Sequence, residues 1–142
     1  MDLDAIKKKF VEEVKLRAFD DKYVDRGEEK EILRSAIDMG VSVDSARGAL
    51  IQVCEMNGYV LESHALRQVK DMMETFATND GKIDEKEFND TVTTCKKATQ
   101  GKKTDIQCKR MVLEIIEENS YKVKTGMFSN WYARAKKEVG MA

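Results

Sequence analysis

Two short stretches of this 142-residue chain carry carboxylates at matching intervals. Residues 21–28 read DKYVDRGE and residues 80–87 read DGKIDEKE, so both follow the pattern D-x-x-[VI]-D-x-x-E. Carboxylate oxygens are the ligands that hard divalent cations such as Ca²⁺ prefer. The six acids are therefore the candidate metal ligands, the second stretch being the stronger: Asp80, Asp84 and Glu87, then Asp21, Asp25 and Glu28.

The spacing supplies only part of a calcium-binding EF-hand loop, whose ligands come from positions 1, 3, 5, 7, 9 and 12, with glycine at position 6. With Gly81 at position 6, the acids of residues 80–87 take positions 5, 9 and 12, but Phe76 and Thr78 take positions 1 and 3. Ca²⁺ takes about six to eight oxygens. The pattern therefore predicts weak binding of Ca²⁺ or another divalent cation, or a site that shares acids between the two loops.

The same acids also have a purely structural interpretation. Asp followed by Gly tolerates the left-handed turn that ends a helix. Asp25 or Asp84 can then cap the next helix, and Glu28 or Glu87, three residues later, completes a capping box. The structural and the metal-binding interpretations both remain open from the sequence.

Two other breaks between helices resemble these stretches: residues 57–64 (NGYVLESH) and 120–127 (SYKVKTGM). In all four breaks a small polar residue is followed, three positions later, by a β-branched residue: Val24, Val60, Ile83 and Val123. These residues are separated by 36, 23 and 40 positions. Such irregular spacing argues against a solenoid array.

The elements that position these residues are predicted to be helices. The chain has no proline, and apolar residues recur three and four positions apart. The apolar positions of the first two helices are Ile6, Phe10, Val14, Leu16, Ile32, Leu33, Ala36 and Ile37. The expected helices cover residues 4–19, 28–39, a third capped by Ser42 or Asp44 and ending near Asn57, 63–76, 84–97, a sixth beginning after Thr104 and including Ile106, and a last one within 125–140.

These elements predict an all-α fold, a compact bundle of about seven helices built from two related helix–loop–helix halves. The length fits one domain over residues 1–142, with halves of about 1–62 and 63–142.

Catalytic and membrane-spanning classes find little support in the composition. His64 is the only histidine, and the three cysteines (Cys54, Cys95 and Cys108) have no zinc-site spacing. No nucleophile system and no phosphate-binding glycine loop is present, so we do not expect an enzyme. No apolar run approaches the roughly 18 residues of a membrane span. Reduced thiols and the absence of a leader favour a cytoplasmic protein.

The charge is uneven along the chain. Residues 1–90 hold 14 Lys and Arg against 21 Asp and Glu, a net −7, whereas residues 91–142 hold 11 against 5, a net +6. Basic residues of the second part lie among Phe128, Trp131 and Tyr132, a mixture that can bind nucleic acid or an anionic membrane face. The same aromatic residues, with Ala135, also fit one face of a helix, which indicates core.

The two acidic stretches, in a seven-helix chain of this length, resemble the TerB-like (tellurite-resistance) family. The matching segments are residues 19–33 and 79–92, and residues 39–50 fall where that family has a helix hairpin. Lys22 departs from the pattern, because it occupies a position where the motif has glycine. The resemblance implies acidic loops able to bind divalent metal, and a role in a stress-response or membrane-associated complex.

The function expected from the sequence is that of a non-enzymatic helical binding or adaptor protein. A protein partner is expected, with weak divalent-metal binding through the acidic loops, in a stress-response or signalling complex. The alternative is a nucleic-acid-binding module that acts through the basic C-terminal half. Peripheral association with a membrane stays compatible with the basic, aromatic C-terminal region.

Overall fold

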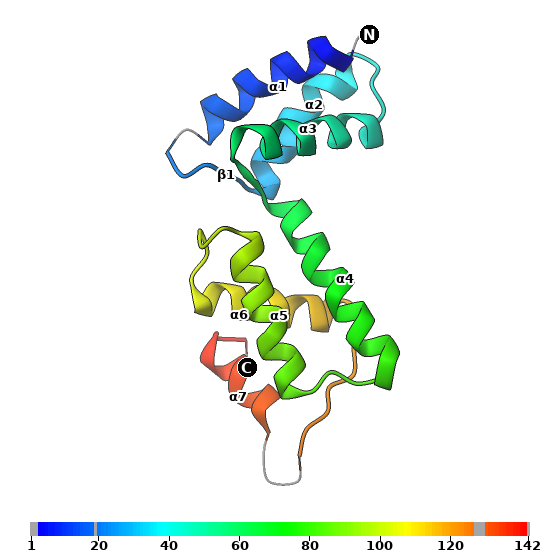
Figure 1. Ribbon diagram of the computed structural model, residues 1–142, viewed down its shortest axis with the longest axis vertical. Helices are drawn as coiled ribbons and strands as arrows, with labels where there is room; N and C mark the ends of the chain where they lie inside the picture. Colours follow the sequence, from blue (N-terminus) through cyan, green and yellow to red (C-terminus); the bar gives the residue numbers. More distant parts are fainter. Residues whose placement is uncertain (1–2, 19, 127–129, 142) are drawn as a thin grey trace. The chain divides into compact units, whose positions relative to one another are not determined.

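The computed structural model describes residues 3–18, 20–126 and 130–141, and within them the chain forms seven α-helices (Figure 1). The helices are α1 (Leu3–Arg17), α2 (Arg26–Asp38), α3 (Val43–Asn57), α4 (Glu62–Asp80), α5 (Glu85–Ala98), α6 (Asp105–Glu118) and α7 (Trp131–Glu138). Two strands of two residues each, β1 (Tyr23–Val24) and β2 (Val60–Leu61), are the other named elements. The all-α class predicted from periodicity is thereby confirmed. None of the helices in the described residues is long and apolar enough to cross a membrane.

The chain divides into two compact units, residues 1–64 and residues 65–142. In unit 1, α1 packs mainly against α3, and α2 contacts both. Their inward faces form one apolar cluster that includes the fully buried side chains of Phe10, Ile32 and Leu50. β1 and β2 pair in parallel, with Val24 opposite Leu61, and so join the turn after α1 to the turn after α3.

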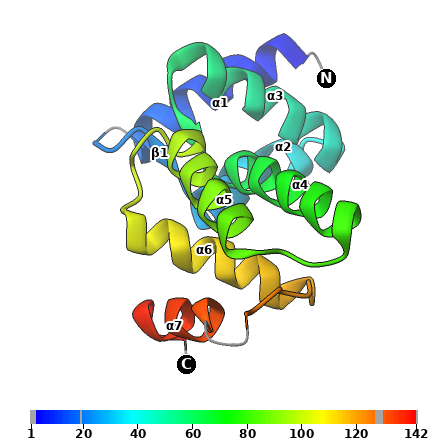
Figure 2. The same ribbon diagram turned by 60° about the horizontal axis from the view of Figure 1, so that its bottom comes forward.

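Unit 2 takes residues 65–80 of α4 as its first helix. Within it α5 packs mainly against α6, and α6 against α7 (Figure 2). A second apolar cluster holds this unit together, with Met73, Leu113 and Ile116 fully buried. A parallel bridge joins Ile83 to Val123, and the Lys124 N–H donates to the Ile83 carbonyl at 2.8 Å. Each unit therefore ties the turn after its first helix to the turn after its third.

The two units repeat one pattern of burial. The two units can be aligned on their helix N-caps. Residues of α1 and α2 then correspond to residues 59 positions later, as Asp25 does to Asp84, and residues of α3 correspond to residues 62 positions later, as Ser42 does to Thr104. The buried residues of α2 and α5 then match one for one: Glu29, Ile32, Leu33 and Ala36 against Phe88, Thr91, Val92 and Cys95. The three buried residues of α1 also have buried counterparts in α4: Ile6, Phe10 and Val14 correspond to Ala65, Val69 and Met73, and α4 buries Leu66 in addition. Of the helices that the structure describes, α7 alone has no counterpart, because in unit 1 the chain passes from β2 directly into α4.

The turns after α3 and α6 show where the sequence alignment of the four breaks fails. The Asn57 side-chain amide donates to the Val53 carbonyl at 2.7 Å, and Asn119 makes the same bond to Ile115 at 2.8 Å. Matching these two asparagines makes Leu61 equivalent to Val123. The alignment of Val60 with Val24, Ile83 and Val123 is therefore wrong by one residue.

Three apolar residues expected to face the core are exposed. Leu16 is 75% exposed, and Ile37 and Ile106 are each more than two-fifths exposed. Each is adjacent to the buried stripe of its helix without being part of it, so periodicity alone placed the edge of the stripe too widely. The fourth helix also runs beyond the expected end at Phe76, to Asp80, where Gly81 adopts a positive φ of 78° and ends it.

Candidate functional sites

The acidic turns, residues 21–28 and 80–87, have the same internal geometry. The Asp21 carboxylate accepts the Tyr23 N–H at 3.1 Å, and the Asp80 carboxylate accepts the Lys82 N–H at 3.2 Å. These are Asx turns, in which a side chain satisfies a backbone amide two residues later. The aspartate that precedes the branched residue by three positions therefore recurs because it holds the turn.

The other four carboxylates form two capping boxes. Asp84 accepts the Glu87 N–H at 2.7 Å, and Glu87 accepts the Asp84 N–H at 3.0 Å. Asp25 and Glu28 make the same exchange at the start of α2, at 2.8 and 3.2 Å. Burial raises the pKa of Glu28 above its usual value, an effect that the bond from the Asp25 amide partly offsets. The six predicted ligands thus begin two helices and hold two turns.

The three acids of each turn lie within eight consecutive residues of the chain. The described residues contain no group of three or more His, Cys, Asp or Glu side chains arranged to hold a metal ion. One oxygen of each of the six carboxylates already accepts a backbone N–H. The weak binding of a divalent cation by these loops stays a prediction.

The backbone explains the one departure from the motif. Lys22 adopts a φ of 53°, and the equivalent Gly81 a φ of 78°. Both therefore occupy the left-handed region, which glycine enters freely and a residue with a Cβ enters at a cost. The first turn keeps the shape of the second despite the unfavourable residue type.

Many of the basic residues of the C-terminal half are engaged in ion pairs. Lys96 lies 2.7 Å from Asp105, Lys109 lies 3.1 Å from Glu138, Arg110 lies 3.0 Å from Glu114, and Lys136 lies 2.8 Å from Glu117. Three of these pairs connect separate helices or helix ends, and both partners of each pair lie within residues 91–142. Nucleic-acid binding by this region stays a prediction.

Trp131 belongs to the core. It is 5% exposed, its indole N–H donates to the Lys124 carbonyl at 2.8 Å, and its ring lies 5.1 Å from that of Phe88. Ala135, one turn further along α7, is also buried. The predicted helical face of aromatic residues is therefore a packing face at these positions, while Phe128 lies outside the described residues.

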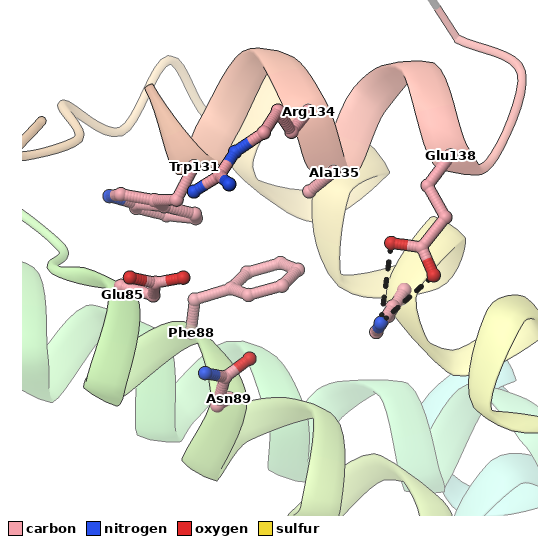
Figure 3. A pocket seen from close by; sticks show the side chains of 8 residues that line it. Glu85, Phe88, Asn89, Trp131, Arg134, Ala135 and Glu138 are labelled. Carbon is pink, nitrogen blue, oxygen red and sulfur yellow. Dashed lines mark hydrogen bonds and ion pairs between the residues drawn. The ribbon is translucent and has the colours of Figure 1, made fainter. Parts of the chain in front are cut away.

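A pocket of about 280 Å³ opens between α5 and α7, with α6 at one side (Figure 3). Phe88, Trp131 and Ala135 supply its apolar walls. Charged and amide side chains complete the lining: Glu85, Asn89, Lys109, Arg134 and Glu138. Figure 3 shows Glu138 at the end of α7 far from Trp131, and Arg134 extending from α7 toward Trp131. The Glu138 carboxylate pairs with Lys109.

Two further contacts fix α7 beside this pocket. Glu117 of α6 accepts bonds from Lys136 and from the Tyr132 hydroxyl, and these bonds lower the pKa of the Glu117 carboxyl, Lys136 having the larger effect. Burial, together with the bond to Glu117, raises the pKa of Tyr132. The helix that bounds the pocket, α7, is therefore held to α5 through Trp131 and to α6 through Tyr132 and Lys136.

The histidine and the three cysteines form no metal-holding group in the part of the chain that the structure describes. His64 lies 3.5 Å from Glu55, near the start of α4. The three cysteines are buried and form no disulfide, and burial raises the pKa of Cys54 to about 12. A thiol with so high a pKa, such as that of Cys54, is protonated and unreactive at neutral pH.

Sequence reasoning missed the pocket, because its lining residues come from three helices with no shared motif. The signal that was available is the pairing of Phe88 with Trp131, since both are large apolar residues in otherwise polar segments.

No protein-family model, curated protein or solved structure matches this chain, and its resemblance to the TerB-like family stays a prediction.

Proposed function

We propose that this chain is a non-enzymatic helical binding protein whose unit 2 docks a protein partner at the pocket between α5 and α7. The observation that carries the proposal is the lining: two aromatic rings below a rim of both charges. Aromatic anchors surrounded by polar groups are typical of the centre of protein–protein interfaces.

The size of the pocket favours a side chain of a partner over a free metabolite. Pockets for small molecules begin at about 300 Å³ and enclose most of their ligand. At about 280 Å³, this pocket suits one apolar or aromatic side chain, with Arg134 and Glu85 placed to meet polar groups beside it. In this role the acidic turns orient the helices, and a weakly bound divalent cation at the turns would reinforce them.

N-acetyl-tryptophanamide and N-acetyl-leucinamide, used as side-chain probes, test the proposal. We expect millimolar probe to shift the amide NMR signals of Glu85, Asn89 and Arg134 in the full chain. Asn89→Trp should abolish the shifts, because Asn89 is exposed and a large side chain there fills the pocket without disturbing the core. Asp90→Trp is the matched control, since Asp90 is exposed and lies outside the lining. Shifts spread evenly over both units would contradict the proposal.

A further inference from the structure

In unit 2, α7 packs on a surface that α5 and α6 form together. It lies against α5 through the contact of Trp131 with Phe88, and against α6 through the pair of Lys109 with Glu138. The Arg110 guanidinium also donates to the Val139 carbonyl, at 3.2 Å, just beyond the end of α7. The seat of α7 is therefore formed by one face of α5 and one face of α6.

Unit 1 has the same two faces, but among its described residues it has no counterpart of α7. The shifts of 59 and 62 positions make Glu29 equivalent to Phe88, Arg47 to Lys109, and Gly48 to Arg110. Arg47 Nε lies 3.4 Å from the Glu29 carboxylate, so these faces of α2 and α3 are opposed as those of α5 and α6 are. By analogy with the seat of α7, we call the surface formed by Arg26, Glu29, Lys30, Arg34, Arg47, Gly48 and Ile51 the α2–α3 groove.

Burial shows that the groove lacks the cover that unit 2 has. Ile51 is only partly buried, whereas its counterpart Leu113 is fully buried. Gly48 lies inside α3, is exposed, and a Cβ added there would meet nothing within 4 Å. Glycine in a helix interior costs stability, and no packing among the described residues requires it. Close approach of another backbone would explain it.

The charge of the groove differs from that of the α7 seat. Arg26, Lys30 and Arg34 follow one another at intervals of four along α2, are exposed, and form no ion pair within the described residues. Their counterparts in unit 2 are Glu85, Asn89 and Thr93. Where α5 carries one acid and two neutral residues, α2 therefore carries three bases.

From this we infer that the α2–α3 groove binds an acidic amphipathic helix of a partner protein. The apolar stripe of that helix packs over Ile51 and Gly48, with the spacing that Trp131, Ala135 and Val139 have in α7. Its carboxylates lie along the edge that faces α2 and pair with Arg26, Lys30 and Arg34. This site is separate from the pocket proposed above, because every residue of the groove belongs to unit 1.

Two synthetic peptides test the inference on the full ¹⁵N-labelled chain. One has the sequence of residues 130–140, and the other has the same sequence with Arg134, Lys136 and Lys137 each replaced by Glu. We expect the acidic peptide to shift amide signals of α2 and α3 and to bind about tenfold more tightly than the basic one, since opposite charges across the interface select the partner. Equal affinity, preference for the basic peptide, or no shift at millimolar peptide would overturn the inference.

Variants locate the binding. Lys30→Glu with Arg34→Glu should weaken binding of the acidic peptide about tenfold or more, because like charges then face each other across the interface. Lys8→Glu with Lys15→Glu is the matched control, because both residues are exposed on α1 and the change in net charge is the same. Circular dichroism confirms that each variant folds. An equal loss in the control, or shifts confined to α5 and α6, also counts against the groove, whereas Asn89→Trp affects only the pocket of unit 2.

Discussion

The ring of Phe88 lies 5.1 Å from that of Trp131, at an interplanar angle of 40°, and this contact fastens α7 to α5. The equivalent position in unit 1 is Glu29, whose buried carboxylate pairs with Arg47. A ring at this position needs an apolar cover, which α7 supplies. A carboxylate needs a cation, which α3 supplies. The residue type at one repeated position thus reflects whether a fourth helix covers the unit.

Trp131→Ala should release α7. We expect the free energy of unfolding to fall by about 3–5 kcal/mol, the usual cost of removing a large buried aromatic side chain. Urea unfolding followed by circular dichroism measures the change. Tyr132→Phe is the control, because it removes only a hydroxyl at the more exposed edge of α7. A loss below about 1 kcal/mol for Trp131→Ala would mean that the helix is not anchored through this residue.

The two acidic turns offer a pair of opposite substitutions. Lys22→Gly should raise the free energy of unfolding by about 1 kcal/mol, because φ is already 53° at this position and glycine relieves the left-handed strain. Gly81→Ala should lower it by a similar amount, because φ there is 78°. Thermal and urea unfolding of both variants give the signs. A stabilising effect of Gly81→Ala would contradict the equivalence of the two turns.

Glu117 provides a pH-dependent contact. Lys136 and Tyr132 lower the pKa of its carboxyl below the usual 4.5. Because the folded pKa lies below the unfolded one, this contact stabilises the fold above pH 4.5 and is lost as the pH falls through the folded pKa. A ¹³C NMR titration of the Glu117 carboxyl should give a midpoint below 4.5, and Lys136→Met should raise it. Lys137→Met, an exposed neighbour, should leave the midpoint unchanged.

Residues whose roles are local could be predicted from the sequence. Asp25, Asp84 and Thr104 cap helices as the spacing indicated, because a capping box involves only four consecutive residues. Glu29 could not be predicted as buried, because its burial depends on Arg47 from another helix. The pairing of Leu61 with Val24 could not be predicted either, because strands of only two residues are too short to show an alternating sequence pattern.

The cysteines should be inert in the native protein. All three are buried, and burial, with Glu29 and Glu55 nearby, raises the pKa of Cys54 to about 12. Ellman's reagent at pH 8 should therefore react slowly with the folded chain and with all three thiols after denaturation in guanidinium. Rapid reaction of one thiol in the native state would mean that its helix opens, and Cys54→Ala, Cys95→Ala and Cys108→Ala would identify which one.

Calcium binding by the acidic turns would be weak and local. Each carboxylate already accepts a backbone N–H, so a cation must share oxygens that hold the turn and the cap. We expect Ca²⁺ to shift the amide signals of residues 80–87 only at millimolar concentrations, with residues 21–28 responding less. The double variant Asp80→Ala, Glu87→Gln should remove the first response, and Asp71→Ala on the exposed face of α4 should not. Unchanged signals in both turns at millimolar Ca²⁺ and Mg²⁺ would leave the six carboxylates with a structural role alone.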